Sequence, residues 1–472
     1  MMPRCFNGEG VPHRRLLVMI GEFKRRFIGQ PLVSGSLAPQ HFPKRTALAI
    51  FASGALSSVV YSTEALLVVL ATGTMLLGYG PLVAAGVALL LLLVAVSYRQ
   101  VVLAYPQGGG GYAVARDHLG VAPSAIAAAA LFAAYVLTVA VSASASAHAL
   151  SSMFHALAPF RVELTLLLIS VITLVNLRSA RVSANLFALP TYLFLFCICT
   201  LLGLGLFHWL SGNIEPTLPT RGVARFSSPF TLLLLAHAFS MGCSALTGGE
   251  TICDAVPAFH SPAPRNAART LLTVALMLGI MMVGMTLLAY VYGVTSQERT
   301  SFETLSSRLA RAVFGDSSPL YYAMQLSTTL ILALAANTAY TDVPRLLSFL
   351  AADGLAAIDG LTRFKGMLLL GFASAALVFV YEAREQLLLP LFAIGMFLFL
   401  TLLQCAVARR SWHLRPAGWR AIVLCSVVGA SVTGAVLVVL LAMRLTFDVG
   451  VMVALIPLAA LALLSNRPRA RC

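Results

Sequence analysis

Long apolar runs separated by short polar stretches recur along the whole chain. Most runs have about 20 or more residues, the length that an α-helix needs to cross the hydrocarbon core of a bilayer. The pattern predicts about twelve spans, near residues 46–78, 81–104, 122–153, 162–178, 184–211, 229–257, 267–294, 318–350, 365–381, 385–408, 420–443 and 446–465. The expected fold class is therefore an all-α polytopic membrane protein.

The same pattern divides the chain into three parts. Residues 1–45 are expected to form a cytoplasmic N-terminal segment, in which RRLLVMIGEFKRRFI (14–28) has the composition of an interfacial amphipathic helix. Residues 46–465 are expected to form one transmembrane transporter domain, because no soluble domain fits between the spans. Residues 466–472 are expected to be a short cytoplasmic tail.

Two predicted spans carry glycines and polar residues within their apolar runs. The first contains FASGALSSVVYSTEALL (51–67) and the sixth contains SALTGGETICDAV (244–256). Glycine costs about 1 kcal/mol within a helix, and a charged residue at mid-membrane costs ~2.5–3.5 kcal/mol on insertion scales. Because these interruptions lie five spans apart, they predict two inverted five-helix repeats, each beginning with a broken helix.

Broken helices at membrane depth line a cavity or are buried in protein, where their free backbone groups can replace the hydration shell of a solute. We therefore expect a binding site near the bilayer midplane. The candidate residues are Gly54, Ser57, Ser58 and Tyr61 in the first span, Tyr135, Thr138 and Ser142 in the third, and Thr247, Gly248 and Glu250 in the sixth. The alternative is that the serines back-bond to the preceding turn and that the third span's hydroxyl stripe serves helix packing.

Acidic residues inside the spans are candidates for proton coupling. Glu250 is the first candidate, because burial favours the neutral form of a carboxyl group and lets a proton bind and leave. The alternative role is a structural acid that accepts hydrogen bonds from the unwound segment. Glu64 is the second candidate, since an ionisable residue within a span indicates a functional site. Asp254 is expected nearer the cytoplasmic mouth, in a solvated or a functional role.

The eighth span ends in AANTAYTDVPRLL (335–347). Asp342 and Arg345 are three residues apart on a helix, so their side chains can pair. This pair is a candidate gate near the inner face of the membrane. The alternative is that both side chains extend to the interface.

Composition supports the membrane assignment and explains the basic balance. The 472 residues are 59% hydrophobic and only 10% charged, and the net charge is +15. The terminal segments and even-numbered loops, together with the span ends that adjoin them, hold 24 of the 32 Lys and Arg residues. This positive-inside pattern places both termini and the even loops in the cytoplasm of a cell (inner) membrane protein. The charge therefore indicates topology and attraction to anionic lipid rather than a nucleic-acid partner.

Signals of catalysis are absent from the sequence. There is no HExxH or GxSxG motif, and the eight cysteines are scattered without metal-ligand spacing. AYPQGGGGYAVARDHLG (104–120) has four consecutive glycines but no following Gly-Lys-Ser/Thr, so it predicts a flexible turn into a short helix rather than a phosphate loop. We expect no enzyme activity and no cofactor.

Several long motifs resemble those of one transporter family. GALSSVVYSTE, SYRQVVLAYPQGGGGY, YVLTVAVSAS, LTGGE and LAANTAYTDVPRL occur in the order found in the KimA-type potassium–proton symporters, which belong to the amino acid–polyamine–organocation (APC) superfamily and are related to the KUP transporters. The resemblance covers roughly residues 27–465. It implies the LeuT-type fold of two inverted five-helix repeats plus two extra helices.

The resemblance also implies an ion site and two departures from it. The family's site falls on Tyr61, on Tyr135, Thr138 and Ser142, and on Thr247 and Glu250, with Glu250 the proton-linked carboxylate. Where the family has aspartate, this chain has Gly54 and Ala134. A dehydrated cation would here be held by Glu250, Glu64 and neutral oxygens.

Three hypotheses of function follow. The first is a proton-coupled secondary transporter that takes up potassium ions. The second keeps the fold but carries an amino acid or a polyamine, because the Gly54 break offers free amides for a carboxylate. The third is a sensor or scaffold that no longer transports. The expected partners are the transported solute, protons and membrane lipid, and the sequence leaves open whether the chain forms a homo-oligomer.

Overall fold

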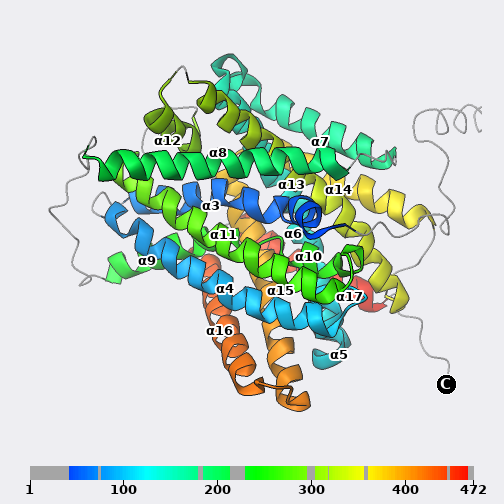
Figure 1. Ribbon diagram of the computed structural model, residues 1–472. Helices are drawn as coiled ribbons and strands as arrows, with labels where there is room; N and C mark the ends of the chain where they lie inside the picture. Colours follow the sequence, from blue (N-terminus) through cyan, green and yellow to red (C-terminus); the bar gives the residue numbers. More distant parts are fainter. Residues whose placement is uncertain are drawn as a thin grey trace, which may run out of the picture.

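A bundle of long helices accounts for nearly all of the structure (Figure 1). The computed structural model describes residues 42–72, 76–178, 184–212, 229–294, 303–316, 318–355, 360–443 and 447–465. Ten helices of these residues are long and apolar enough to cross a membrane, and two shorter apolar helices cover Phe364–Val380 and Val453–Ser465. Each predicted span coincides with one of these twelve, which confirms the all-α membrane fold class.

The helices form two series with the same order of elements. The first series is α2 (Lys44–Phe51), α3 (Ser53–Ala71), α4 (Gly80–Ala104), α5 (Gly110–Leu119), α6 (Val121–Met153), α7 (Arg161–Leu177) and α8 (Ala184–Leu210). The second is α9 (Pro229–Gly242), α10 (Gly249–Asp254), α11 (Ala263–Val291), α12 (Leu305–Phe314), α13 (Pro319–Ala352), α14 (Gly360–Val380) and α15 (Glu385–Leu414). The helices α16 (Trp419–Met443) and α17 (Phe447–Ser465) follow both series.

The two series share the same order of elements, and their short helices and third spans have nearly equal lengths. Each series begins with an interrupted helix, and its third span follows a short helix of 10 residues, α5 or α12. The third span has 33 residues in α6 and 34 in α13. The predicted arrangement of two five-helix repeats is therefore present in the structure.

Equivalent helices of the two series pack against each other. The pairs α4 with α11, α6 with α13 and α7 with α14 are all in contact, and α3 packs against α9. In Figure 1, α4 and α11 run side by side across the face of the molecule, with α3 behind them. This pairing brings the two interrupted helices together in the middle of the bundle.

The first interruption lies at Ala52, two residues before the predicted position at Gly54. Helical bonding ends with the Ala52 amide on the Leu48 carbonyl (2.9 Å) and resumes with the Leu56 amide on the Ala52 carbonyl (2.8 Å). Hydroxyls satisfy two of the carbonyls in between. Thr191 of α8 donates to the Ala49 carbonyl (3.0 Å) and Ser53 donates to the Ile50 carbonyl (3.2 Å).

The second interruption is longer and depends on Gly248. The helix α9 ends at Gly242, a 3₁₀ turn covers Cys243–Ala245, and α10 begins only at Gly249. Gly248 has φ +86°, a conformation that costs other L-residues about 1–2 kcal/mol. A β-carbon there would lie 2.7 Å from the Ala55 β-carbon and 2.8 Å from its backbone nitrogen. A glycine is therefore required for this close approach of α3.

Some predictions fall outside the described residues. The interfacial helix at 14–28 and the tail at 466–472 are among them, and the proposed domain limits stay predictions. The glycine motif after α4 is described, and it does lead into a short helix, α5. Its glycines pack closely against other elements, since a β-carbon on Gly110 would collide with the Asp254 carboxylate. A β-carbon on Gly111 would collide with the Phe399 ring.

Candidate transport site at the two helix interruptions

Glu250 lies in the first turn of α10, beside the second interruption. Its side chain is buried, with the residue 5% exposed. The Gly248 amide donates to Glu250 Oε1 (2.9 Å), and the Thr247 hydroxyl is 3.5 Å from the same oxygen. The positive end of the α10 dipole and this amide both favour a carboxylate here. Glu250 is thus the acid that organises the interruption, and the three predicted residues Thr247, Gly248 and Glu250 lie together.

Tyr98 of α4 is a residue of this site that the sequence did not indicate. Its hydroxyl donates to Glu250 Oε2 at 3.4 Å, and its side chain is buried. The ring needs the glycine at position 249, because a β-carbon there would lie 2.7 Å from Tyr98 Cε2. A tyrosine in an apolar run resembles a core residue in sequence, so only the contact with Glu250 distinguishes it.

The predicted residues of α3 approach the interruption through their backbone and hydroxyl groups. The Ser57 hydroxyl donates to the Gly54 carbonyl (3.0 Å), which is the back-bonding alternative. Ser58 back-bonds to the Ala55 carbonyl (2.6 Å) and also reaches the Ala245 carbonyl (3.3 Å) of the second interrupted helix. A β-carbon on Gly54 would meet only the Thr338 hydroxyl, at 3.4 Å. Ser58 therefore joins the two interruptions directly.

The third-span stripe is buried but makes few contacts with α10. Thr138 back-bonds to the Ala134 carbonyl (2.8 Å), and Ser142 is 1% exposed. The Tyr135 hydroxyl is buried and has no hydrogen-bond partner among the described residues. It lies within electrostatic range of Asp342, Asp254 and Glu250. Tyr135 is thus the member of the stripe that faces the acids, and its open hydroxyl is available to a solute or a water molecule.

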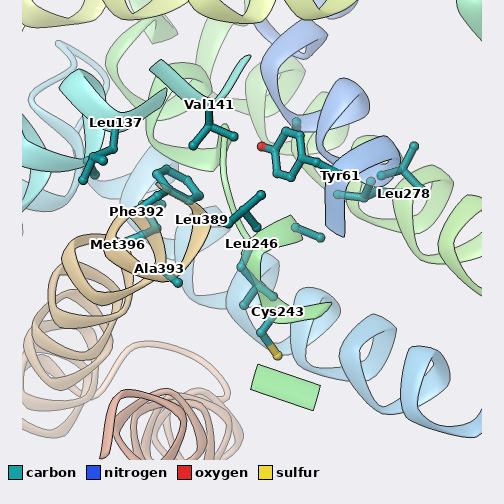
Figure 2. Packing of buried hydrophobic residues seen from close by; sticks show 14 of the residues in the cluster. Tyr61, Leu137, Val141, Cys243, Leu246, Leu278, Leu389, Phe392, Ala393 and Met396 are labelled. Atoms are coloured by element: carbon teal, nitrogen blue, oxygen red, sulfur yellow. The ribbon is translucent and has the colours of Figure 1, made fainter. Parts of the chain in front are cut away.

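Apolar side chains surround the unwound segment. Figure 2 shows Leu246 of this segment between Tyr61 of α3, Val141 of α6 and Phe392 of α15. On the other side of the segment, a cavity of about 40 Å³ lies against α4 and α11, and its lining includes Ala55, Tyr98, Thr247 and Gly248. A water-sized particle needs about 10–15 Å³ of such space. The cavity has room for a dehydrated monovalent cation, which is about as large as a water molecule.

A second group of acids follows Glu250 along α10. Thr251 donates to Asp342 Oδ2 of α13 (2.6 Å), and Arg345 pairs with Asp342 Oδ1 (3.1 Å). Asp342 is fully buried, whereas the Arg345 side chain is 32% exposed. Asp254 is buried within electrostatic range of both residues. The predicted Asp342–Arg345 pair therefore exists within α13, and the hydrogen bond from Thr251 to Asp342 ties α13 to α10.

Aromatic and backbone contacts close the bundle beyond this pair. The Phe42 amide donates to the Ala258 carbonyl (2.8 Å), and the His260 amide donates to the Phe42 carbonyl (3.1 Å). Phe51 of α2 stacks with Phe259 (centroids 5.7 Å apart), and the Arg345 guanidinium lies 5.9 Å from the Phe51 ring centroid. The start of the first series is thus fastened to the end of α10.

The helix α5 closes the same end from another side. Tyr112 donates to Asp353 Oδ2 (2.7 Å), and Arg116 forms an ion pair with the same carboxylate at the end of α13. Burial raises the pKa of the Tyr112 hydroxyl, and the bond to Asp353 adds to the effect. Tyr112 therefore stays protonated and remains a donor at neutral pH.

Glu64 lies away from these contacts, at the other end of α3. It is 6% exposed, and its Oε2 accepts a hydrogen bond from the Leu305 amide at the start of α12 (3.1 Å). The Ser152 hydroxyl accepts from the Thr304 amide nearby (3.0 Å). The structure therefore keeps Glu64 apart from Glu250, and both ends of the central region are closed. No group of three or more His, Cys, Asp or Glu residues among the described residues has metal-binding geometry.

The fold and the site define a secondary transporter of the membrane, with a buried acid between two interrupted helices. The profile of the amino acid permease family matches residues 45–463. The potassium transporter KimA of Bacillus subtilis (strain 168) is 40% identical over 429 residues, which are 89% of this chain and 70% of that protein. The chain therefore belongs to the amino acid permease family, as a KimA-type member of it.

Solved structures share the fold. A manganese transporter of Eremococcus coleocola, in complex with an aromatic bis-isothiourea substituted compound, has a TM-score of 0.51 and 14% identity, covering 92% of this chain and 98% of that one. A mutant of the same transporter also has a TM-score of 0.51, with 13% identity and 92% and 97% coverage. At these identities the likeness concerns the fold alone, and it agrees with the predicted fold class.

Proposed function

We propose that this protein is a proton-coupled transporter that takes up potassium ions across the cell membrane. The buried Glu250 carboxylate, held between the Gly248 amide and the Tyr98 hydroxyl, is the observation that carries the proposal. A carboxylate in this position can hold a dehydrated cation or a proton, and exchange between the two couples their movements. The name of the relative from Bacillus subtilis supports potassium as the solute.

Neutral oxygens complete the proposed cation site. Gly54 and Ala134 provide no carboxylate where the resemblance expects one. Among the oxygens left near Glu250 are the Thr247 hydroxyl, the Tyr98 hydroxyl and the unpartnered Tyr135 hydroxyl. Tyr61 and Ser142 line the same region but are not in contact with Glu250 by any hydrogen bond. We expect Glu250 to supply the charge and these groups to supply coordination.

An amino acid or polyamine is the second candidate solute. The match to the amino acid permease family favours it, and so does the first turn of α3, whose amides have no partner within the helix. The bond between the Gly248 amide and Glu250 disfavours it, because that bond uses an amide of the second interruption that a substrate carboxylate would need. A protein that moves neither kind of solute would be a sensor or scaffold.

Glu250→Gln tests the proposal in liposomes that contain the purified full-length protein. A rubidium tracer reports uptake of a potassium analogue, and an internal dye reports proton entry. Loss of a charged partner worth about 1.5–3 kcal/mol predicts a roughly 10- to 100-fold lower uptake of both. Glu163→Gln changes an exposed carboxyl on α7 and is the matched control.

Three other results would contradict the proposal. Rubidium uptake that persists without proton entry would remove the coupling. Uptake of a labelled amino-acid pool in place of rubidium would favour the second candidate, and no uptake of either solute would favour the scaffold.

We further propose that both termini face the cytoplasm, that anionic lipid surrounds the basic loops, and that the solute leaves chemically unchanged.

A further inference from the structure

Three titratable side chains meet at the end of the bundle that α12 covers. They come from different spans: Glu64 from α3, His148 from α6 and Glu385 from α15. His148 Nδ1 is 3.0 Å from Glu385 Oε1, and Glu64 lies within electrostatic range of both. Glu64 and Glu385 are each 6% exposed, and the His148 side chain is 13% exposed. We call these three residues the outer cluster.

One atom of the outer cluster lacks a partner. Glu385 Oε2 is buried and has no hydrogen-bond partner among the described residues, although Oε1 of the same carboxyl group bonds to His148. Leaving a buried carboxylate oxygen unpaired costs the full desolvation of that atom. A proton on this carboxyl group, or on the neighbouring imidazole, would lower that cost. The open oxygen is therefore a position that can take a proton.

Two basic groups from neighbouring helices act on the outer cluster. Arg308 of α12 is the basic group that acts on Glu64, and Arg161 of α7 acts on His148. Two carboxylates this close repel each other, so one of them favours the protonated form. Glu64 Oε2 already accepts a hydrogen bond from the α12 backbone. Glu385, whose Oε2 is open among the described residues, and the imidazole bonded to its Oε1 are therefore the groups that can share a proton.

The outer cluster lies on the helix faces that also border the central site. Glu64 is one turn beyond Tyr61 on α3, and Glu385 is one turn before Leu389 on α15, so each shares a face with a side chain that Figure 2 shows pointing inward. His148 is two turns beyond Val141 on α6, on the inward face of that helix. From Ala55 to Glu64, α3 rises by about 14 Å.

We propose that Glu64, His148 and Glu385 form an outer proton-binding site, which takes a proton from the α12 side before it reaches Glu250. The proton comes from hydronium in the outer solvent, which leaves as water, and is held as an imidazolium N–H or a carboxyl O–H. The Ser144 hydroxyl, one turn from His148 toward the centre, is buried, has no partner in the part of the chain that the structure describes, and provides the next polar atom. The role of this site in coupling rests on the proposed function, whereas the positions of its three side chains do not.

Infrared spectroscopy of the full-length protein in lipid discs tests the site without transport. The C=O stretch of protonated carboxyl groups is recorded while the pH is varied between about 4 and 9. We expect Glu385→Gln to remove one titrating component of this band. His148→Gln should shift its midpoint by about one pH unit, a tenfold change in proton concentration. Glu163→Gln leaves the band of the cluster unchanged.

Transport measurements then test the role in coupling. We expect Glu385→Gln to shift the external pH of half-maximal rubidium uptake by about one unit, while rubidium binding to solubilised protein stays within twofold. A carboxyl band identical to that of the unaltered protein would overturn the proton site. An unchanged pH profile beside a changed band would overturn the proposed route to Glu250. If Glu250→Gln kept coupled uptake while the band changed as expected, the proposed function would fail and the site would stand.

Discussion

Gly248 is a residue at which the two halves of the molecule approach closely. Its positive φ and its contact with Ala55 explain why glycine stands there, and its amide holds Glu250. The sequence indicated Gly248 and Glu250 because a double glycine followed by an acid is costly inside an apolar helix. It indicated nothing about Ala55, since the contact depends on how α3 and α10 meet in space.

Gly248→Ala should reduce both stability and uptake. Gly418→Ala is the control, because Gly418 also has a positive φ, +75°, but a β-carbon there would meet nothing within 4 Å. The control should cost only the conformational strain of about 1–2 kcal/mol. Gly248→Ala adds the collision with Ala55, so its unfolding temperature should fall further and its rubidium uptake should be lost. Equal unfolding temperatures of the two variants would show that the collision is relieved without cost.

Tyr98→Phe should weaken uptake without unfolding the protein. The change removes the hydroxyl that donates to Glu250 and keeps the ring that packs on Gly249. The bond is long, at 3.4 Å, and a net contribution of about 0.5–1.5 kcal/mol predicts a roughly 2- to 10-fold fall in uptake. The matched control is Tyr322→Phe on the exposed side of α13. Equal uptake by both variants would remove Tyr98 from the site.

Hydroxyl groups were the least predictable residues of the site. Ser57 and Thr138 occur at helical spacing from other candidates, yet both donate to carbonyls of their own helix. Ser58 does the same and also reaches the other interruption. Spacing places a hydroxyl on a face but does not choose between these acceptors, because a nearby carbonyl is always available within the helix.

At the scale of elements, hydropathy predicted the spans well and the interruptions less well. Each apolar run became a helix, because a run of this length needs its backbone bonds satisfied internally. The first interruption lies at Ala52 rather than at Gly54. At this position the hydroxyls of Ser53 and Thr191 donate to carbonyls that helix amides would otherwise satisfy. Thr191 belongs to a distant part of the sequence, so the position of the interruption depends on it as well.

The glycine motif after α4 shows the same dependence on distant elements. Composition predicted a flexible turn, whereas the structure packs Gly110 against Asp254 and Gly111 against Phe399. Small size rather than flexibility is what this motif provides. No property of the motif alone identifies the residues that approach it.

The Asp342–Arg345 pair on α13 should respond unequally to the loss of either partner. Arg345→Gln leaves the fully buried Asp342 carboxylate without its cation, whereas Asp342→Asn leaves an arginine that solvent already reaches. We expect Arg345→Gln to cost about 1–3 kcal/mol, a value reduced for the partial exposure of Arg345, and Asp342→Asn to cost less. Thermal unfolding of both variants measures the difference. A larger loss in Asp342→Asn would show that the bond to Thr251 matters more than the ion pair.

At the scale of the whole molecule, the repeat was predicted from just two sequence patterns. The two halves share little sequence identity. Because the interruptions lie five spans apart, however, the two repeats were expected to contain the same number of helices. The structure adds that the short helices α5 and α12 are also equivalent. The sequence did not indicate that they are equivalent, because one follows a glycine motif and the other begins after a capping threonine, Thr304.

The orientation of the repeat in the membrane can be measured by cysteine labelling. In a background without the eight native cysteines, Glu382→Cys lies between α14 and α15, and Pro416→Cys lies between α15 and α16. The distribution of Lys and Arg places the first outside and the second inside. A membrane-impermeant thiol reagent applied to intact cells should label only Glu382→Cys. Labelling of Pro416→Cys alone would invert the topology.

The short backbone pairing between Phe42 and residues 258–260 holds one end of the helix bundle closed. It consists of two hydrogen bonds, each worth about 0.5–1.5 kcal/mol in net terms. Releasing it therefore costs about 1–3 kcal/mol, which a solute can offset if it binds the released form roughly 10- to 100-fold more tightly. The solute-bound and the solute-free protein would then differ in how often this backbone pairing opens.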